Sequence, residues 1–292
     1  MSRQTTGIAG LDEALGGGLL PGTLTVIVGA TGVGKTQLGV NWLYRGGCDE
    51  KRPGAIVDLS SRGDLQSHSD YAERMFQWKL KQENLRWHTP QSLFEQHVPN
   101  ELLPFLGYEG RRVLRSQMDP EDWDAWQSEI NRRLPILEQF VYLHLVHGTR
   151  RFLVDGIEPQ ENPEDSLQLE LLERIYHRML RKEHDWLARD VFRQDYRSVA
   201  ELVAKHAYPH VDSSAMVLVT TRETMLEQLM MRPLAEGDLV AGANTLILMG
   251  RVLDGGRMKR ALYIAKHRGS RCDERILTFE IDDRGLKLNP IE

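Results

Sequence analysis

The residues most suited to chemistry in this sequence form one glycine-rich segment. The pattern Gly-x-x-x-x-Gly-Lys-Ser/Thr is matched in full by Gly29, Ala30, Thr31, Gly32, Val33, Gly34, Lys35 and Thr36. Its glycines let backbone N–H groups converge on phosphate oxygens, and the start of a following helix adds partial positive charge. In this pattern Lys35 bridges the β- and γ-phosphates, and the Thr36 hydroxyl coordinates a metal. We therefore expect ATP and Mg²⁺ to bind at residues 29–36.

An aspartate further along the chain completes the expected metal site. Asp155 ends an apolar run, where P-loop NTPases place the carboxylate that holds Mg²⁺ through water. The alternative is a turn cap beside Gly156. Thr220 and Thr221 end the next apolar run, where a hydroxyl could sense the γ-phosphate; a hydrogen-bonded strand end is an equal alternative for both.

Short β-branched runs predict the buried strands that position these groups. The helix after the glycine-rich segment is expected to end at Gly46 and Gly47. Later runs flank the sequence Asp254-Gly255-Gly256, which favours an antiparallel hairpin, and the last strand is expected to turn at residues 283–285. We expect an α/β fold with a mainly parallel sheet and antiparallel C-terminal strands, built from residues 23–28, 55–59, 152–155, 216–221, 245–249, 261–265 and 276–281.

Two stretches interrupt this strand pattern, at about 66–149 and 164–207, and both are expected to be helical insertions. Prolines divide the first into several short helices. Basic clusters at 111–115 and 181–182 are interleaved with acidic residues, so a solvated mixed-charge face is expected there. Pairs of histidines at 144 and 147 and at 206 and 210 have no third ligand, so no metal beyond Mg²⁺ is expected.

Composition narrows the class of protein. Hydrophobic residues make up 41% of the 292 residues and charged residues 27%. No uncharged apolar run approaches the roughly 18 residues of a membrane-spanning helix, and the N-terminus carries no secretory signal. Two cysteines cannot form a disulfide framework, which favours the cytoplasm. A net charge of −5 argues against a protein built mainly to coat nucleic acid.

The segments around the motif resemble a known family. Thr6 to Asp12, Leu15 to Leu19 and Pro21-Gly22 precede the P-loop, and Lys266 to Ser270 and Phe279 to Ile281 follow it. This arrangement resembles the KaiC-type branch of the RecA-superfamily ATPases. The resemblance covers residues 5–60, about 151–157 and about 213–288. It implies a single RecA-like ATPase domain over 1–292 that assembles into a ring, such as a hexamer, or a filament, with ATP between protomers.

The same resemblance implies roles for four C-terminal residues. The segment matching Lys266 and Arg268 reaches the γ-phosphate held by the neighbouring protomer, where cations neutralise charge developing on the transferred phosphoryl group. Arg260 and Asp283 are implied to lie near the nucleotide base from the partner side. The alternative is a solvated edge strand protected by its charges.

The sequence departs from the family at the end of the second strand. The family has paired glutamates there, one of which polarises the attacking water, whereas this chain has Ser60 and Ser61. A hydroxyl cannot accept a proton at neutral pH as a carboxylate can. Asp58 precedes the serines and is expected to point to the other face of the strand, while Asp64 and Glu158 are carboxylates that could substitute. We therefore expect slow hydrolysis, or hydrolysis only when the protein is assembled or bound to a partner.

Three functions are compatible with these features. The leading hypothesis is a P-loop ATPase that acts as a nucleotide-controlled assembly or signalling switch and presents its helical insertions to a protein partner. The second is a recombinase-like, DNA-dependent ATPase. It is less favoured because no zinc ribbon, helix-hairpin-helix signature or long basic tail is present. The third is a scaffold that binds ATP without hydrolysing it.

Overall fold

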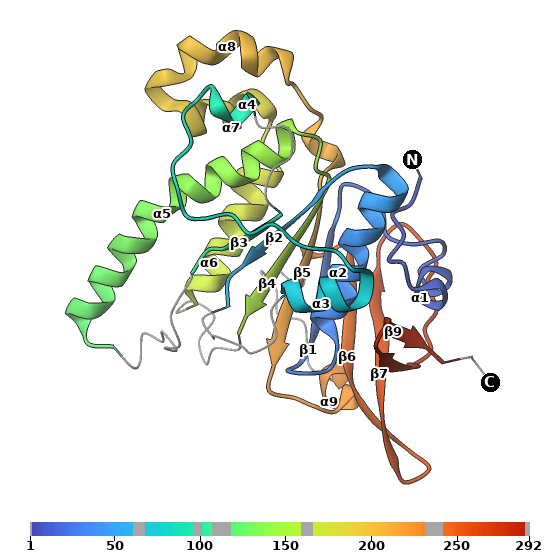
Figure 1. Ribbon diagram of the computed structural model, residues 1–292. Coiled ribbons are helices and arrows are strands. Elements are labelled where there is room, and N and C mark those ends of the chain that lie inside the picture. The colour runs from blue at the N-terminus through green and yellow to red at the C-terminus, as the bar shows by residue number, and fades with distance from the viewer. Residues whose placement is uncertain are drawn as a thin grey trace.

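A nine-stranded sheet organises the molecule (Figure 1). The structure is a computed structural model, and it describes residues 2–60, 68–95, 101–106, 118–158, 166–231 and 242–289. The strands follow the order β3-β2-β4-β5-β1-β6-β7-β8-β9. Strands β1 to β6 run parallel to one another, and the pairs β6-β7, β7-β8 and β8-β9 are antiparallel. The expected mainly parallel α/β sheet with antiparallel C-terminal strands is confirmed.

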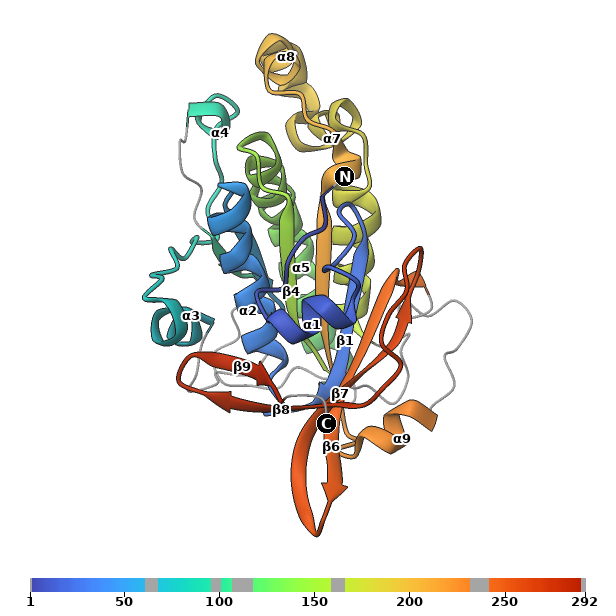
Figure 2. The same ribbon diagram turned by 90° about the vertical axis from the view of Figure 1, so that its right-hand side faces the viewer.

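The central strands of the sheet are buried, whereas the hairpin formed by β6 and β7 is exposed at its turn. The buried centre consists of short β-branched strands, as parallel sheets require. The hairpin of β6 and β7 turns at Gly255 and Gly256, as predicted, and projects beyond the rest of the sheet (Figure 2). The strand bounds are Leu24–Ala30 (β1), Gly54–Asp58 (β2), Leu102–Pro104 (β3), Arg151–Ile157 (β4), Ser214–Thr221 (β5), Thr245–Asp254 (β6), Arg257–His267 (β7), Leu277–Asp282 (β8) and Gly285–Leu288 (β9).

Helices cover both faces of the sheet (Figures 1 and 2). Helices α1, α2 and α3 lie on one face, and α5, α6 and the π-helical turn η4 lie on the other. Helices α4, α7 and α8 stand beyond the amino ends of the central strands. The bounds are Ala9–Ala14 (α1), Lys35–Arg45 (α2), Gly46–Glu50 (η1), His68–Phe76 (α3), Ser92–Glu95 (α4), Pro120–Val146 (α5), Leu167–Glu173 (α6), Arg174–Leu180 (η4), His184–Phe192 (α7), Arg193–Asp195 (η5), Tyr196–Lys205 (α8), His210–Asp212 (η6) and Leu226–Met231 (α9).

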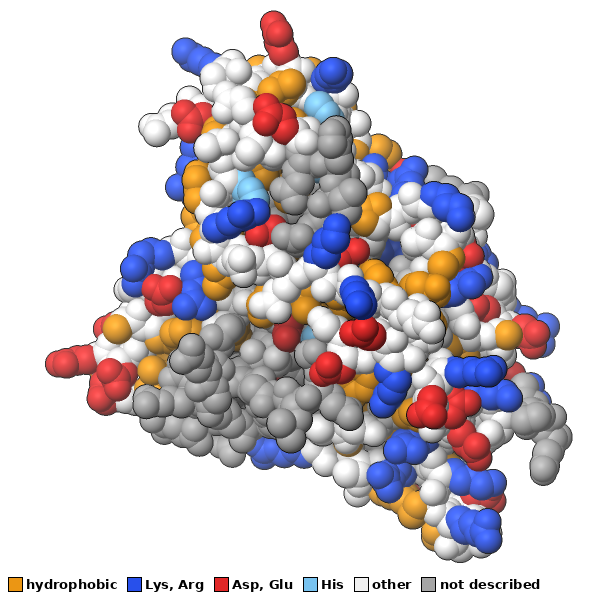
Figure 3. Space-filling view, viewed as in Figure 1, with side chains coloured by type: hydrophobic (Ala, Val, Ile, Leu, Met, Phe, Trp, Pro, Cys, Tyr) orange, Lys and Arg blue, Asp and Glu red, His pale blue; other side chains and the backbone are white. Residues whose placement is uncertain are grey.

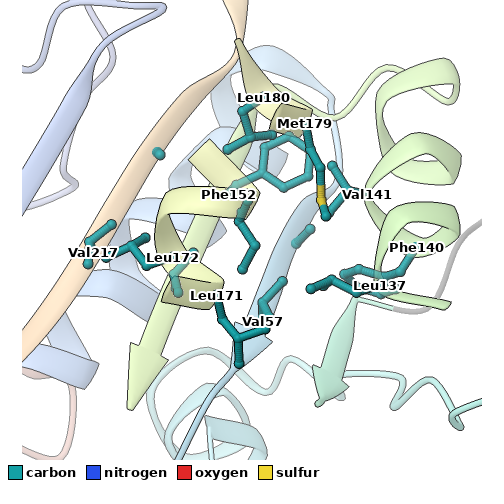
Figure 4. Packing of buried hydrophobic residues seen from close by; sticks show 14 of the residues in the cluster. Val57, Leu137, Phe140, Val141, Phe152, Leu171, Leu172, Met179, Leu180 and Val217 are labelled. Atoms are coloured by element: carbon teal, nitrogen blue, oxygen red, sulfur yellow. The ribbon is translucent and has the colours of Figure 1, made fainter. Parts of the chain in front are cut away.

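Alternate residues of the central strands divide the core into two halves, because successive side chains of a strand point to opposite faces. Val57 and Phe152 belong to the half under α5, α6 and η4, where they pack with Leu137 and Leu171 (Figure 4). Their neighbours Ile56 and Leu153 belong to the half under α1 and α2. Both faces of the central sheet are therefore buried.

The expected end of the first helix is confirmed, since α2 ends at Arg45 and Gly46 is its C-cap residue. The π-helical turn η1 then continues the path to Glu50, and the left-handed residue is Lys51, with φ of 56°. Gly46 is helical and serves another purpose: a Cβ there would lie 2.7 Å from Cδ of Arg151. This buried arginine donates hydrogen bonds to the carbonyl oxygens of Thr5 and Trp42 and so ties β4 to α2.

The interpretation of the first insertion as several short helices holds for α3 and α4 but is wrong for the residues that follow them. Residues 120–146 form one helix that contains Pro135. Pro120 occupies its first turn, where no amide donor is needed, and the Asp119 side chain caps it by accepting from the Asp122 amide at 2.9 Å. Leu102–Pro104 form an edge strand of the sheet, in which Pro104 takes the last position. Residues 111–115 lie outside the described residues.

No helix within the described ranges combines the length and the apolar character needed to cross a membrane.

Candidate nucleotide-binding site

The glycine-rich segment forms the turn between β1 and α2. Gly32 and Gly34 have φ of 75° and 117°, left-handed conformations that glycine adopts without steric cost. A Cβ at Gly32 would have no neighbour within 4 Å, whereas a Cβ at Gly34 would lie 2.8 Å from Cδ1 of Ile281. The turn is therefore open above Gly32 and supported by β8 below Gly34. This is the form that a backbone cradle for phosphate requires.

Lys35 lies buried inside this turn. Its Nζ donates to the carbonyl oxygens of Gly29 at 2.9 Å and Ala30 at 3.0 Å. Burial lowers the pKa of Lys35 to about 8, against the opposing effect of the Asp155 carboxylate. Because carbonyl dipoles compensate an ammonium less well than a full negative charge does, a phosphate at the turn would stabilise the charged side chain.

Thr36 and Asp155 meet across the end of the sheet, as predicted. Thr36 Oγ1 donates to Oδ2 of Asp155 at 2.9 Å, and the amide of Gly156 donates to Oδ1 at 2.7 Å. Burial raises the pKa of Asp155, but His68, Thr36 and the Gly156 amide outweigh it and hold the pKa below its usual value. An ionised carboxylate beside a hydroxyl is the hard oxygen donor set that suits Mg²⁺, so these residues fit the metal that the motif implies.

A histidine that sequence reasoning missed completes this cluster. His68, the first residue of α3, is buried and places Nε2 3.0 Å from Oδ2 of Asp155. Its Nδ1 lies 3.7 Å from Oδ2 of Asp58. Burial lowers the pKa of His68, but the two carboxylates outweigh burial and raise the pKa above its usual value. The histidine therefore bridges two acidic strand ends.

The expectation that Asp58 faces away from the site is wrong. Asp58 and Asp155 are register partners on adjacent parallel strands, so their side chains share one face of the sheet. Burial raises the pKa of Asp58, while His68 and the Ser60 amide, which donates to Oδ1 at 2.8 Å, oppose that rise. A second carboxyl group thus stands close to the expected metal ligand.

The end of β2 passes very close to the end of β4. Gly156 has φ of 94°, and a Cβ there would lie 2.1 Å from the backbone nitrogen of Ser60. The Leu59 amide donates to the Asp155 carbonyl at 2.8 Å. Glu158, one proposed substitute for the missing glutamates, is buried, and its amide donates to Gln168 of α6 at 3.0 Å. Ser61 and the other proposed substitute, Asp64, lie outside the described residues.

Lys266 and Arg268 are not brought to the P-loop of their own chain. Lys266 pairs with Leu246, which pairs with Val26 near the start of β1. The Arg268 amide donates to the Asn244 carbonyl, still further from the loop. The P-loop follows the carboxyl end of β1, and a strand rises about 3.3 Å per residue. Lys266 and Arg268 therefore lie toward the amino end of β1, away from the P-loop of their own chain.

Arg260 and Asp283 have the opposite placement. Arg260 pairs with Phe279 on β8, and both Phe279 and Ile281 lie close to Gly34 of the same chain. Asp283 is exposed in the turn that follows β8. The antiparallel strands thus fold back across the start of α2 of their own chain. Their contact with a base stays a prediction.

The remaining candidate residues have structural partners or stand beside the loop. Thr220 and Thr221 pair with Gly29 and Ala30, and the Thr221 hydroxyl donates to the Glu223 carbonyl. His144 Nδ1 lies 2.9 Å from the Thr149 hydroxyl, and His147 Nε2 lies 2.9 Å from the Leu93 carbonyl oxygen. Across the described ranges, no three metal-ligating side chains gather as a site.

The second basic cluster does not form a solvated face at Arg181. Its guanidinium donates to the carbonyl oxygens of Gly22 and Ser213 and so ties η4 to the starts of β1 and β5. Lys182 instead pairs with Asp190. On the side drawn in Figure 3, basic and acidic side chains lie interspersed over the described residues, as a mixed-charge surface requires.

A glycine-rich turn between β1 and α2, an aspartate on β4 and the order β3-β2-β4-β5-β1 are the features of a P-loop fold with a RecA-like sheet. The model of the KaiC ATPase family matches residues 4–84. The circadian clock protein KaiC2 of Synechocystis sp. is 48% identical over 54 residues, which are 18% of this chain and 10% of that protein. The chain therefore carries a KaiC-like P-loop ATPase core of the RecA superfamily, and the matched stretch spans a tenth of the relative's length.

Proposed function

We propose that this protein binds Mg-ATP at residues 29–36 and uses it as a switch that controls assembly with further copies of itself. The observation that carries the proposal is the convergence of Lys35, Thr36 and Asp155 at the carboxyl edge of the sheet. These side chains come from α2 and β4, and their types match the parts that bind triphosphate and metal in P-loop NTPases.

The polar atoms of each side chain determine which part of Mg-ATP it would bind. Lys35 would leave the carbonyl oxygens of Gly29 and Ala30 and bind phosphate oxygens. The Thr36 hydroxyl would hold Mg²⁺ directly, and Asp155 would hold it through water. When bound, Mg²⁺ supplies positive charge that offsets the charge on the phosphates. Arg260 and Asp283, carried on strands beside Gly34, would contact the nucleotide from the same chain.

The position of Lys266 and Arg268 supports a nucleotide shared between protomers. Both cations lie toward the amino end of β1, away from their own P-loop, so a P-loop on which they act would belong to another copy. A cation delivered in this way raises phosphoryl-transfer rates by about 10³ to 10⁵. Hydrolysis would then depend on assembly, as a switch requires.

The end of β2 supports slow turnover. Ser60 occupies the position where the family carries a glutamate, and a hydroxyl accepts a proton poorly at neutral pH. The nearby carboxyl groups of Asp58 and Asp155 are both engaged with His68. A long-lived ATP state gives a protein partner time to bind, and α7 and α8 of the second insertion offer it a surface that includes Trp186, 59% exposed.

Mass measurement in solution, combined with phosphate release, tests this proposal. The protein at micromolar concentration is examined alone, with Mg-ATP and with Mg-ADP by light scattering. We expect Mg-ATP to shift the mass to a multiple of the chain, with phosphate release far slower than one per second. An unchanged mass with saturating Mg-ATP would refute the switch, and rapid turnover would refute the slow step.

A further inference from the structure

We propose that His68 occupies the position on Asp155 that the water of bound Mg²⁺ needs, so that metal binding must displace the histidine. On the basis of the proposed function, His68 is a positioning residue that closes the metal site in the absence of nucleotide. Nothing in the sequence marked this histidine, which follows the end of β2 by ten positions.

Oδ2 of Asp155 can accept only a limited number of hydrogen bonds. A carboxylate oxygen has two lone pairs in its plane. Oδ2 of Asp155 accepts from Thr36 Oγ1 at 2.9 Å and from His68 Nε2 at 3.0 Å, so both positions are taken. Because the carboxylate only accepts, Nε2 carries the hydrogen of the second bond. The Gly156 amide uses Oδ1 on the other side, at 2.7 Å.

The expected metal ligand Thr36 determines which oxygen of Asp155 the bound metal would face. A metal held by the Thr36 hydroxyl stands on the Oδ2 side of Asp155, since that hydroxyl bonds to Oδ2. A water on this metal must find an acceptor on the same oxygen. His68 holds that acceptor, and the two donors therefore compete for it.

The surroundings of His68 explain how it keeps this position. Its side chain is buried, and Nδ1 faces Asp58 at 3.7 Å, so a second carboxyl group holds the ring from behind. The other end of α3 packs against the nucleotide-binding helix, where Phe76 stacks on Tyr44 of α2 with ring centroids 4.1 Å apart. Displacement of His68 would therefore disturb α3, the helix that also packs against α2.

The test compares Mg²⁺ affinity at a saturating concentration of a non-hydrolysable ATP analogue. Three variants are measured by calorimetry: His68→Ala, His68→Gln and, as a matched control, His177→Ala. His177 also faces a carboxylate, Glu173 at 3.4 Å, but on the surface of η4. Gln removes any charge of the imidazole but keeps an N–H donor at the position of Nε2.

We expect His68→Ala to bind Mg²⁺ about threefold to tenfold more tightly than the wild type, the effect of one exchanged hydrogen bond. His68→Gln and His177→Ala should stay near the wild type. An unchanged or weaker Mg²⁺ affinity in His68→Ala overturns the proposal. Equal tightening in Ala and Gln also overturns it, because charge alone would then explain the effect.

A second measurement, by NMR, follows the His68 side chain in the wild-type protein. The ring N–H resonance of His68, assigned by its absence from the His68→Gln spectrum, should shift or vanish when Mg²⁺ joins the bound analogue. Addition of the analogue alone should leave it in place. A resonance that Mg²⁺ does not alter overturns the proposal. If the wild type binds no analogue at all, the proposed function fails instead, so the two failures are distinguishable.

Discussion

Thr36 and Asp155 lie 119 positions apart in the chain, yet the threonine hydroxyl donates a 2.9 Å hydrogen bond to the aspartate. Two parallel strands produce this contact. Strand β1 delivers the start of α2, and β4 ends at the same edge of the sheet, with β5 between them. The hydroxyl hydrogen is directed to the carboxylate, which leaves the lone pairs of Thr36 Oγ1 free for a metal.

Substitution of Thr36 by Val should remove the metal dependence of nucleotide binding. The variant keeps the β-branched shape but lacks the oxygen, so we expect Mg²⁺ affinity in the presence of nucleotide to fall at least about tenfold. Thr36→Ser keeps the oxygen and should bind Mg²⁺ nearly as the wild type does. Titration of Mg²⁺ by calorimetry checks both. Equal affinity in Val and Ser would show that Thr36 is not a ligand.

The pKa of Lys35, lowered to about 8, predicts a pH dependence of nucleotide affinity. Only the charged ammonium attracts phosphate, and above pH 8 most chains without nucleotide carry a neutral Lys35. The dissociation constant for Mg-ATP should therefore rise about tenfold between pH 7 and pH 9. Calorimetry at the two pH values provides the measurement. A constant affinity would contradict the lowered pKa.

The same shift predicts a change of stability in the nucleotide-free protein. The pKa of Lys35 is lower in the folded state, about 8, than the ordinary value of 10.5. Between these values the unfolded chain binds more protons than the folded one, so the contribution of Lys35 makes the free energy of unfolding rise with pH. Urea unfolding of the wild type and Lys35→Met, compared at pH 7 and pH 9, isolates this contribution. A difference between the two proteins that does not change with pH would contradict it.

Gly156→Ala should destabilise the protein more than Gly148→Ala. Both glycines have nearly the same φ, 94° and 93°, so the cost of holding alanine in this left-handed conformation should be similar at the two positions. A Cβ at Gly156 would lie 2.1 Å from the Ser60 nitrogen, whereas one at Gly148 would have no neighbour within 4 Å. We expect about 1 kcal/mol at Gly148 and at least about 3 kcal/mol at Gly156. Urea unfolding checks the difference, and equal costs would contradict the close crossing of β2 and β4.

Mixing two inactive variants tests whether Arg268 acts between protomers. Lys35→Ala keeps Arg268, and Arg268→Ala keeps the P-loop. If the arginine acts on a neighbour, an equimolar mixture restores up to about a quarter of wild-type phosphate release, because that share of random interfaces pairs an intact loop with an intact arginine. Release no higher than the mean of the two variants measured separately would contradict action in trans.

The parts of the fold that sequence predicted best have strong local signals. The segment 29–36 combines glycines, lysine and threonine at fixed spacing, and Gly255-Gly256 marks a hairpin between two apolar runs. These patterns act within a few residues, and tertiary contacts do not override them. Asp155 was predictable for a related reason: an acidic residue directly after a buried parallel strand reaches the carboxyl edge of the sheet.

The errors came from contacts between distant residues. Gly46 marks the end of α2, but its close contact with Arg151 of β4 has no local signal. Leu102–Pro104 are too short and too rich in proline to signal a strand, and become one because β2 offers an open edge. Pro135 suggested a break in a helix that packing of α5 sustains. His68 had no signal beyond its position at the start of a helix that follows the second strand.

Calorimetric titration of Mg-ATP into the wild type, Lys35→Ala and Lys182→Ala tests the central claim most directly. Lys182 pairs with Asp190 on the surface and serves as the control for loss of a lysine. The P-loop assignment predicts one nucleotide per chain for the wild type and for Lys182→Ala, with binding lost in folded Lys35→Ala. Absence of heat from the wild type, or equal binding by all three proteins, would contradict it.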